Sequence, residues 1–154
     1  MATPVVIESL DALEKMVGKE IAVSDWIEVS QARIDAFADA TEDHQWIHVD
    51  VERAKASPMG TTIAHGYLTL SLIAGFSQST FKVNGVKMGL NYGLNRVRFT
   101  GMVPAGSRLR GRFVLKAADR IEGGLQMTYT VTVEREGSDK PVCVAETISR
   151  ALAA

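Results

Sequence analysis

The sequence has few of the residues on which several protein classes depend. Only one of its 154 residues is a cysteine, so Cys143 has no partner for an intramolecular disulfide and cannot build a cysteine-rich zinc site. Aromatic residues make up 6% of the chain, which leaves no stacking platform for nucleic acid. No apolar run approaches the roughly 20 residues of a membrane span, and the first residues lack the pattern of a secretory signal. We therefore expect a cytoplasmic protein that binds neither nucleic acid nor membrane.

The formal net charge of −1 hides two halves of opposite sign. Residues 1–77 carry 5 Lys/Arg and 12 Asp/Glu, whereas residues 78–154 carry 12 and 6. This asymmetry indicates either an anionic partner or two halves that pack against each other. The length and an apolar fraction of 46% suit one packed domain. We expect it to span residues 1–154, with an N-terminal helical extension over residues 1–21.

The first half of the chain has the pattern of helices. Apolar residues recur at helical spacing over residues 10–17, and Ser30 and Asp50 are suited to cap two further helices. Residues 41–48, between those helices, are expected to form a loop. Residues 66–76 carry no charge, which is typical of a helix buried in the middle of a protein.

The second half has the pattern of strands. Apolar and polar residues alternate over residues 108–116 and 125–134, which indicates half-buried strands. Turn residues follow at 119–123 and 137–141, and further strands are expected over 87–99 and 142–150. Helices followed by a run of strands predict an α+β protein, with an antiparallel sheet wrapped around the central apolar helix.

The candidate catalytic groups lie close together in the sequence. Asp43 and His48 could hold one water between a carboxylate and an imidazole, and together they could move its protons. The structural alternative is that Asp43 caps a turn and His48 is a packed, hydrogen-bonded histidine. A metal site would use the same residues with His44, but further ligands are not apparent, so we expect none.

Gly66 stands at the start of the apolar helix. An N–H group there points out of the positive end of the helix dipole, and in a dry site it could stabilise a developing oxyanion. The alternative is that Gly66 is small only to let the helix enter the sheet. No nucleophile elbow, P-loop or dinucleotide-binding motif occurs, and Cys143, inside a strand pattern, is expected to be a core residue.

Two motifs together resemble a known family. They are Phe37-Ala38-x-x-Thr41-x-Asp43-x-x-x-x-His48-x-Asp50 and Ile63-Ala64-His65-Gly66. With the strand-rich second half, they make residues 22–153 similar to the MaoC-like (R)-specific enoyl-CoA hydratases. The segment 43–50 looks most like the nodulation protein N branch of that family.

The resemblance implies a fold, an activity and an assembly. The fold would be a single hot-dog, in which the sheet wraps the Gly66 helix. The activity would be a lyase of fatty-acid metabolism, the reversible hydration of trans-2-enoyl-CoA to (R)-3-hydroxyacyl-CoA. Subunits would pair as a homodimer, with the acyl-CoA tunnel along the dimer interface. No metal or other cofactor is implied, since CoA enters as part of the substrate.

The resemblance also assigns roles to residues. Asp43 and His48 would hold the catalytic water, and the Gly66 N–H would polarise the thioester carbonyl. Relatives often carry a serine near position 74 that supports the catalytic pair, but Ala74 stands here, so another group must hold His48 or the activity is tuned differently. Gln45 is expected to form a hydrogen bond within the site loop. The candidate substrate-binding residues are Gln45, His65, Tyr67, Asn91 and Arg98.

Two other functions fit the same residues. A hot-dog thioesterase would direct the water at the thioester carbon, and a non-catalytic subunit would only bind acyl groups. For the hydratase and the thioesterase alike, the basic half of the chain would attract the phosphates of CoA. The candidate side chains are Arg96, Arg98, Arg108, Arg110 and Arg112.

Overall fold

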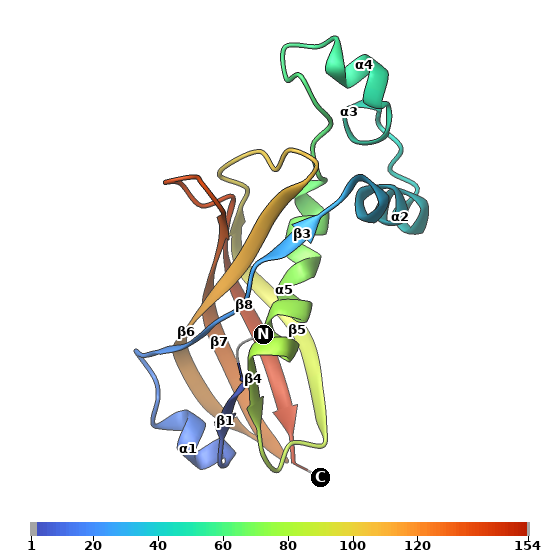
Figure 1. Ribbon diagram of the computed structural model, residues 1–154. Coiled ribbons are helices and arrows are strands. Elements are labelled where there is room, and N and C mark those ends of the chain that lie inside the picture. The colour runs from blue at the N-terminus through green and yellow to red at the C-terminus, as the bar shows by residue number, and fades with distance from the viewer. Residues whose placement is uncertain (1–2, 154) are drawn as a thin grey trace.

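An antiparallel sheet forms the body of the molecule in the computed structural model, which describes residues 3–153 (Figure 1). Five of its six strands follow the order β2-β6-β7-β8-β5, and the sixth, β3, also pairs with β6. Their bounds are β2 Glu20–Val23, β3 Ile27–Val29, β5 Met88–Arg98, β6 Ser107–Ile121, β7 Gly124–Arg135 and β8 Cys143–Leu152. The four long strands confirm the strand pattern of the second half.

Helix α5 (Gly66–Thr80) packs against the inner face of this sheet. Every second residue is buried from Leu109 to Leu115 in β6 and from Leu125 to Val133 in β7, as the alternating pattern predicts. A Cβ on Gly111 would lie 3.0 Å from the Phe76 ring, so the missing side chain lets the helix approach the sheet closely. The arrangement confirms the predicted α+β hot-dog fold.

One flank of α5 is not covered. Leu68, Ile73 and Phe76 are buried against the sheet, whereas the opposite flank is exposed at Tyr67, Ser71, Ala74, Gly75 and Gln78. The expectation of a helix buried on every side is therefore wrong for the single chain, because no other described part of the chain covers this flank. None of the described helices is both long and apolar enough to cross a membrane.

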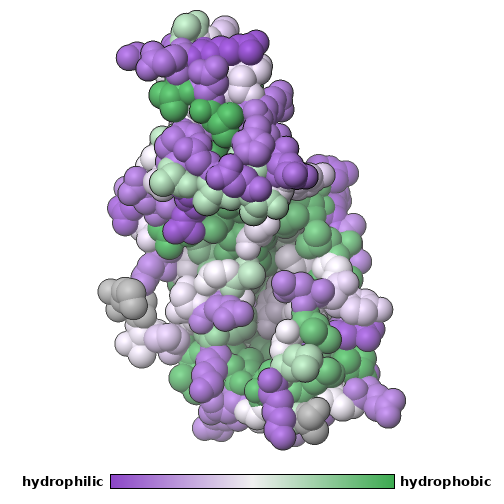
Figure 2. All heavy atoms as spheres, turned by 90° about the vertical axis from the view of Figure 1, so that its right-hand side faces the viewer, coloured by the Kyte–Doolittle hydropathy of each residue, from purple (hydrophilic) through white to green (hydrophobic). Residues whose placement is uncertain are grey.

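Strand β5 is open as well. It ends the sheet beside β8, and all of its residues except Val97 are exposed. Figure 2 shows this face, where hydrophobic side chains surround a hollow below a lobe of three helices formed by residues 31–55. The large apolar side chains exposed on β5 are Met88, Leu90, Tyr92 and Leu94.

The lobe lies beyond the N-terminal end of α5 (Figure 1). It consists of α2 (Gln31–Thr41), α3 (Trp46–Val49) and α4 (Val51–Lys55). Both predicted caps are confirmed: Ser30 accepts the Arg33 N–H at 3.2 Å, and Asp50 accepts the Arg53 N–H at 3.1 Å. The predicted loop ends earlier than expected, because His48 lies on the single turn of α3.

The expected N-terminal helical extension is only partly helical. Its one described helix is α1 (Leu10–Glu14), whereas β1 (Val5–Ile7) pairs in parallel with β4 (Phe81–Val83). β2 begins at Glu20 and joins the main sheet. Residues 1–2 lie outside the described part of the chain.

Candidate active site

His48 is held on three sides in the wall of a cavity. The residue is buried, and its Nδ1 lies 2.7 Å from the Ile63 carbonyl oxygen. Its own carbonyl accepts the Gln31 side-chain amide at 2.8 Å. Because a carbonyl can only accept, Nδ1 carries the hydrogen, and Nε2 keeps a free lone pair. The His48 ring can therefore accept a proton at Nε2.

Asp43 lies beside this ring. It follows Glu42, whose left-handed φ of 64° ends α2 and turns the chain toward the site. One Asp43 carboxylate oxygen, one ring nitrogen of His48 and one ring nitrogen of His65 all lie within 4.8 Å of one another. Since two hydrogen bonds of ordinary length span such a gap, one water can bridge Asp43 and His48. The structure thus brings the predicted pair together, and it also gives His48 the packing of the structural alternative.

His65 links Asp43 to His48. Its Nε2 lies 3.0 Å from the Asp43 backbone carbonyl. Its ring stacks on that of His48, with centroids 3.8 Å apart and planes 22° apart, and Phe37 packs on it at 4.9 Å. The Nδ1 atom is buried without a hydrogen-bond partner among the described residues. With 2% of the residue exposed, His65 lies behind His48 rather than at an open surface.

Gly66 begins α5 at a small cavity of about 330 Å³ that His48 and Thr69 also line. Its N–H has no acceptor within the part of the chain that the structure describes, as expected at a helix start. A Cβ on Gly66 would lie 2.9 Å from the Phe99 ring. Gly66 is therefore both a free donor facing the cavity and a position with no room for a side chain.

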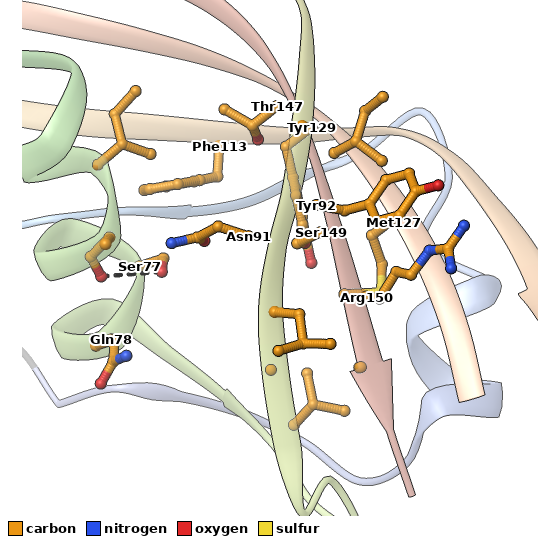
Figure 3. Close-up of a pocket in the computed structure, with 18 of the residues that line it drawn as sticks. Ser77, Gln78, Asn91, Tyr92, Phe113, Met127, Tyr129, Thr147, Ser149 and Arg150 are labelled. Carbon is orange, nitrogen blue, oxygen red and sulfur yellow. Dashed lines mark hydrogen bonds between the residues drawn. The ribbon is translucent and has the colours of Figure 1, made fainter. Parts of the chain in front are cut away.

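A second cavity of about 770 Å³ lies between α5 and the strands β5 and β8 (Figure 3). Asn91 points from β5 toward α5, whereas Tyr92 points the other way. The Arg150 guanidinium lies over the Tyr92 ring, 3.6 Å from its centroid. Leu70 lines this cavity and the preceding Thr69 lines the smaller one, so the two cavities follow each other along the helix. The inner wall is formed by Phe113, Met127 and Tyr129, and burial raises the pKa of the Tyr129 hydroxyl.

The other predicted substrate-binding residues are spread out. Asn91 lines the larger cavity. Tyr67 is 70% exposed, and its ring lies edge-to-face with that of Phe99, with centroids 6.0 Å apart. Arg98 donates to its neighbouring Val97 carbonyl at 2.7 Å. Tyr67, Arg98 and Gln45 line neither cavity.

The expected hydrogen bond of Gln45 exists only through its backbone. The Gln45 N–H donates to the Asp43 carboxylate at 3.4 Å, and the Gln45 carbonyl accepts the His48 N–H at 3.0 Å. The Gln45 side chain is exposed and has no hydrogen-bond partner among residues 3–153. Ala74 lines the larger cavity, and the Ile63 carbonyl is the group that holds His48.

Three of the candidate phosphate-binding arginines are already paired. Arg108 binds Glu136 at 2.9 Å, Arg110 binds Glu134 at 2.8 Å, and Arg112 binds Glu20 at 2.6 Å. Arg120 also binds Asp11 and Glu14. Arg112 and Arg120 thus join the basic half to the acidic half, whereas Arg108 and Arg110 bind acidic residues of their own half. Arg96 and Arg98 remain the candidates for an anionic ligand.

Sequence reasoning missed three contributors to the site. Phe99 covers Gly66 from the end of β5, and only the fold reveals that contact. Ile63 acts through its backbone, for which side-chain identity carries no signal. Gln31 accepts the Thr62 hydroxyl at 2.5 Å and donates to the His48 carbonyl, so it joins the two segments that carry the motifs.

Comparisons with known proteins identify the family of the chain. The model of the MaoC like domain matches residues 12–137. The chain is 50% identical over 147 residues to 3-hydroxyacyl-thioester dehydratase Z of Mycobacterium tuberculosis, covering 95% of this chain and 97% of that protein. It is 51% identical over 144 residues to nodulation protein N of Rhizobium leguminosarum, covering 92% and 89%.

A solved structure has the same fold. The unliganded R-hydratase of Pseudomonas aeruginosa superposes with a TM-score of 0.71 at 22% identity, over 95% of this chain and 86% of that one. The family predicted from the two motifs is therefore confirmed, and the chain belongs to the MaoC-like dehydratases.

Proposed function

We propose that this protein catalyses the reversible (R)-specific hydration of trans-2-enoyl-CoA to (R)-3-hydroxyacyl-CoA. One observation carries the proposal: the Asp43 carboxylate and a ring nitrogen of His48 lie within 4.8 Å of each other, and His48 shares a cavity with the N-terminus of α5 at Gly66. The name of the 50% identical relative, a 3-hydroxyacyl-thioester dehydratase, supports hydro-lyase chemistry.

The Asp43/His48 pair handles the water. Both groups accept hydrogen bonds from it, since Nε2 of His48 has a free lone pair and a carboxylate only accepts. As the water oxygen bonds to C3 of the enoyl group, the pair takes up one proton. The same pair returns a proton to C2, so that both additions occur on one face of the double bond. Water is consumed, and nothing is oxidised or reduced.

The Gly66 N–H stabilises the negative charge that develops on the thioester oxygen. When oxygen adds at C3, the electrons of the double bond move onto the thioester as an enolate. The Gly66 N–H points from the positive end of a 15-residue helix, and a donor aimed at such an oxygen contributes about 3 kcal/mol to transition-state stabilisation. His48 and Gly66 line one cavity, so a single bound thioester can reach both.

The larger cavity suits the acyl chain. It begins at Leu70, directly after Thr69 of the smaller cavity, and continues along α5 to Gln78. Its inner wall contains Phe113 and Met127, which offer the apolar surface that binds hydrocarbon. We propose acyl-CoA as the substrate, with no metal or redox cofactor.

A homodimer accounts for the exposed face of the chain. β5 leaves one edge of the sheet unpaired, and a long exposed edge is a template for pairing with another strand. Its exposed Leu90 and Leu94 lie beside the larger cavity, next to the uncovered flank of α5. We propose that a second copy of the chain covers this face and completes the walls of the acyl site.

The decisive experiment is a hydration assay of purified protein with enoyl-CoA esters of increasing chain length. Loss of the enoyl thioester, with an (R)-3-hydroxyacyl-CoA product identified by chiral analysis, is the expected result. The (S) product, or no hydration at any chain length, would contradict the proposal. Measuring thiol release in the same reactions identifies a thioesterase. Binding without any turnover identifies a non-catalytic acyl-binding subunit.

A further inference from the structure

We propose that His65 is a positioning residue that fixes the water-activating pair relative to the Gly66 amide. The inference rests on the proposed function, in which Asp43 and His48 hold the water. His65 touches neither the water nor the thioester in that scheme. It acts through three separate contacts, each made by a different part of the residue.

The first contact orders the Asp43 loop. The Asp43 carbonyl can only accept, so Nε2 of His65 donates to it at 3.0 Å. The Asp43 carboxylate itself is exposed, and its one hydrogen bond within the described loop is the longer contact of 3.4 Å to the Gln45 N–H. The shorter, partly buried bond to His65 therefore anchors the backbone that carries the carboxylate.

The second contact orders the base. The His48 ring is held at its edge by the Ile63 carbonyl, and that bond alone leaves the ring free to rock about the bond axis. The His65 ring lies on the face of His48 at 3.8 Å, and Phe37 supports His65 from another side at 4.9 Å. Edge and face contacts together fix the direction of the Nε2 lone pair of His48.

The third contact is made by the backbone. The His65 carbonyl accepts the N–H groups of Leu68 and Thr69 at 3.1 and 3.2 Å, which begins α5. Gly66, the donor for the thioester oxygen, is the next residue. Covalent geometry sets the separation of C3 and the thioester oxygen in the substrate, so the water pair and the Gly66 N–H must be held at a matching separation.

The orientation of the ring supports this role. Nδ1 of His65 is buried with no partner among the described residues, although an unpaired buried acceptor lowers stability. The ring thus satisfies the hydrogen bond of only one of its two nitrogens, the one that contacts Asp43. At 2% exposure it is not placed to bind substrate, the role suggested by the sequence.

Two substitutions separate the contributions of the ring and of the donor. His65→Gln keeps an amide donor for the Asp43 carbonyl, whereas His65→Phe keeps a ring on His48 without the donor. We expect His65→Phe to lower kcat for crotonyl-CoA hydration about 100-fold and to change KM less than about threefold. The kcat of His65→Gln should be about tenfold higher than that of His65→Phe. His44→Gln is the control, because exposed His44 in the same loop binds Asp39 and the Glu42 backbone and should keep the parent rate.

The proposal is overturned if His65→Phe matches the parent, or if the variants raise KM and leave kcat unchanged, as loss of a substrate contact would. Nitrogen-15 NMR of the parent at neutral pH gives a test that needs neither a folded variant nor activity. We expect hydrogen on Nε2 of His65 and on Nδ1 of His48; hydrogen on Nδ1 of His65 also overturns the inference. An inactive parent with the expected tautomers would instead contradict the proposed function.

Discussion

The carbonyl oxygen of Ile63 accepts the Nδ1–H of His48 at 2.7 Å. The Ile63 N–H in turn donates to the Ile47 carbonyl, one residue before His48, at 3.0 Å. The segment before α5 is thus tied to α3 by a backbone bond and a side-chain bond. A carbonyl that fixes the other nitrogen of an imidazole sets its tautomer. The hydrogen bond that holds the His48 ring is thus made by the backbone, while Ala74 lines the larger cavity.

We expect Asp43→Asn to abolish most of the hydration activity. The amide keeps the size of the side chain but cannot take up a proton, and loss of a general acid–base group costs about 10²–10⁴-fold in rate. Because Asp43 is exposed, the free energy of unfolding should change by less than about 0.5 kcal/mol. Steady-state kinetics with crotonyl-CoA and thermal unfolding measure the two effects.

Asp39→Asn is the matched control. Asp39 is an exposed carboxylate on α2 that binds His44 at 3.0 Å, so its loss should leave turnover unchanged. If Asp43→Asn hydrates crotonyl-CoA as fast as the parent, or if both variants lose activity equally, Asp43 is not part of the catalytic pair.

The roles of Gly66 can be separated with a second substitution. In Gly66→Ala the new methyl group meets the Phe99 ring at 2.9 Å, and such overpacking costs about 1–3 kcal/mol. The N–H survives but moves, so kcat should fall up to about 100-fold for a shift of about 1 Å. Adding Phe99→Ala removes the collision and should restore much of the stability and rate.

If the double variant regains stability but not rate, the Phe99 ring itself contributes to catalysis. If Gly66→Ala alone hydrates at the parent rate, the position of the Gly66 N–H does not matter and the oxyanion role is refuted. Thermal unfolding and kcat for crotonyl-CoA, measured on all three proteins, distinguish these outcomes.

Chelators should not affect the enzyme. Asp43, His48 and His65 lie close enough for a metal ion, but the two rings are stacked with planes only 22° apart. Ring lone pairs lie in the ring planes, so two nearly parallel rings cannot both direct a lone pair at one ion. Dialysis against EDTA should leave hydration unchanged, and elemental analysis should find far less than one metal per chain. Activity lost to EDTA and restored by Zn²⁺ would refute this reasoning.

Much of the fold was predictable from local pattern. The alternation in β6 and β7 follows from one buried face, and it was correct because period-two burial leaves a direct trace in the sequence. The caps Ser30 and Asp50 were correct for the same reason, since each bonds its own helix. The short strands β1 and β4 were missed, because a three-residue strand depends on its distant partner rather than on its own sequence.

The site was predictable only as far as side chains define it. The spacing of Asp43 and His48 and the position of Gly66 came from motifs, and the structure brings all three together. The motifs did not predict the contacts that hold these residues in place. Ile63 acts through its carbonyl, and Phe99 approaches from the end of β5, more than thirty residues further along the chain. The positioning role that we propose for His65 could not be predicted from the sequence for a similar reason, since burial is a property of the assembled fold.

Leu94→Lys should break the proposed homodimer. Leu94 is 47% exposed on the open strand β5, and a charge on an exposed edge opposes pairing with another strand. We expect a dimer for the parent in sedimentation equilibrium, and a dissociation constant raised at least about tenfold for the variant, or about 1.4 kcal/mol. Val6→Lys is the control, since Val6 is 60% exposed but lies on β1, which belongs to the separate two-stranded sheet. A monomeric parent, or a variant as dimeric as the parent, would show that β5 is not the interface.

Glu134 should make the fold sensitive to acid. Its side chain accepts from Arg110 at 2.8 Å and lies 3.3 Å from Arg112, and these guanidinium groups, Arg110 foremost, lower its pKa. A carboxyl with a lowered pKa in the folded state stabilises the protein fully above the ordinary Glu pKa of about 4.3. That stabilisation is lost as the pH falls through the lowered folded-state value.

Glu134→Gln should therefore lower Tm at pH 7 and reduce the fall in Tm between neutral and acidic pH. Glu122→Gln, at an exposed turn between β6 and β7, should retain the parent profile. Parallel Tm–pH curves for the parent and Glu134→Gln would mean that the Arg110 pair contributes nothing to acid sensitivity.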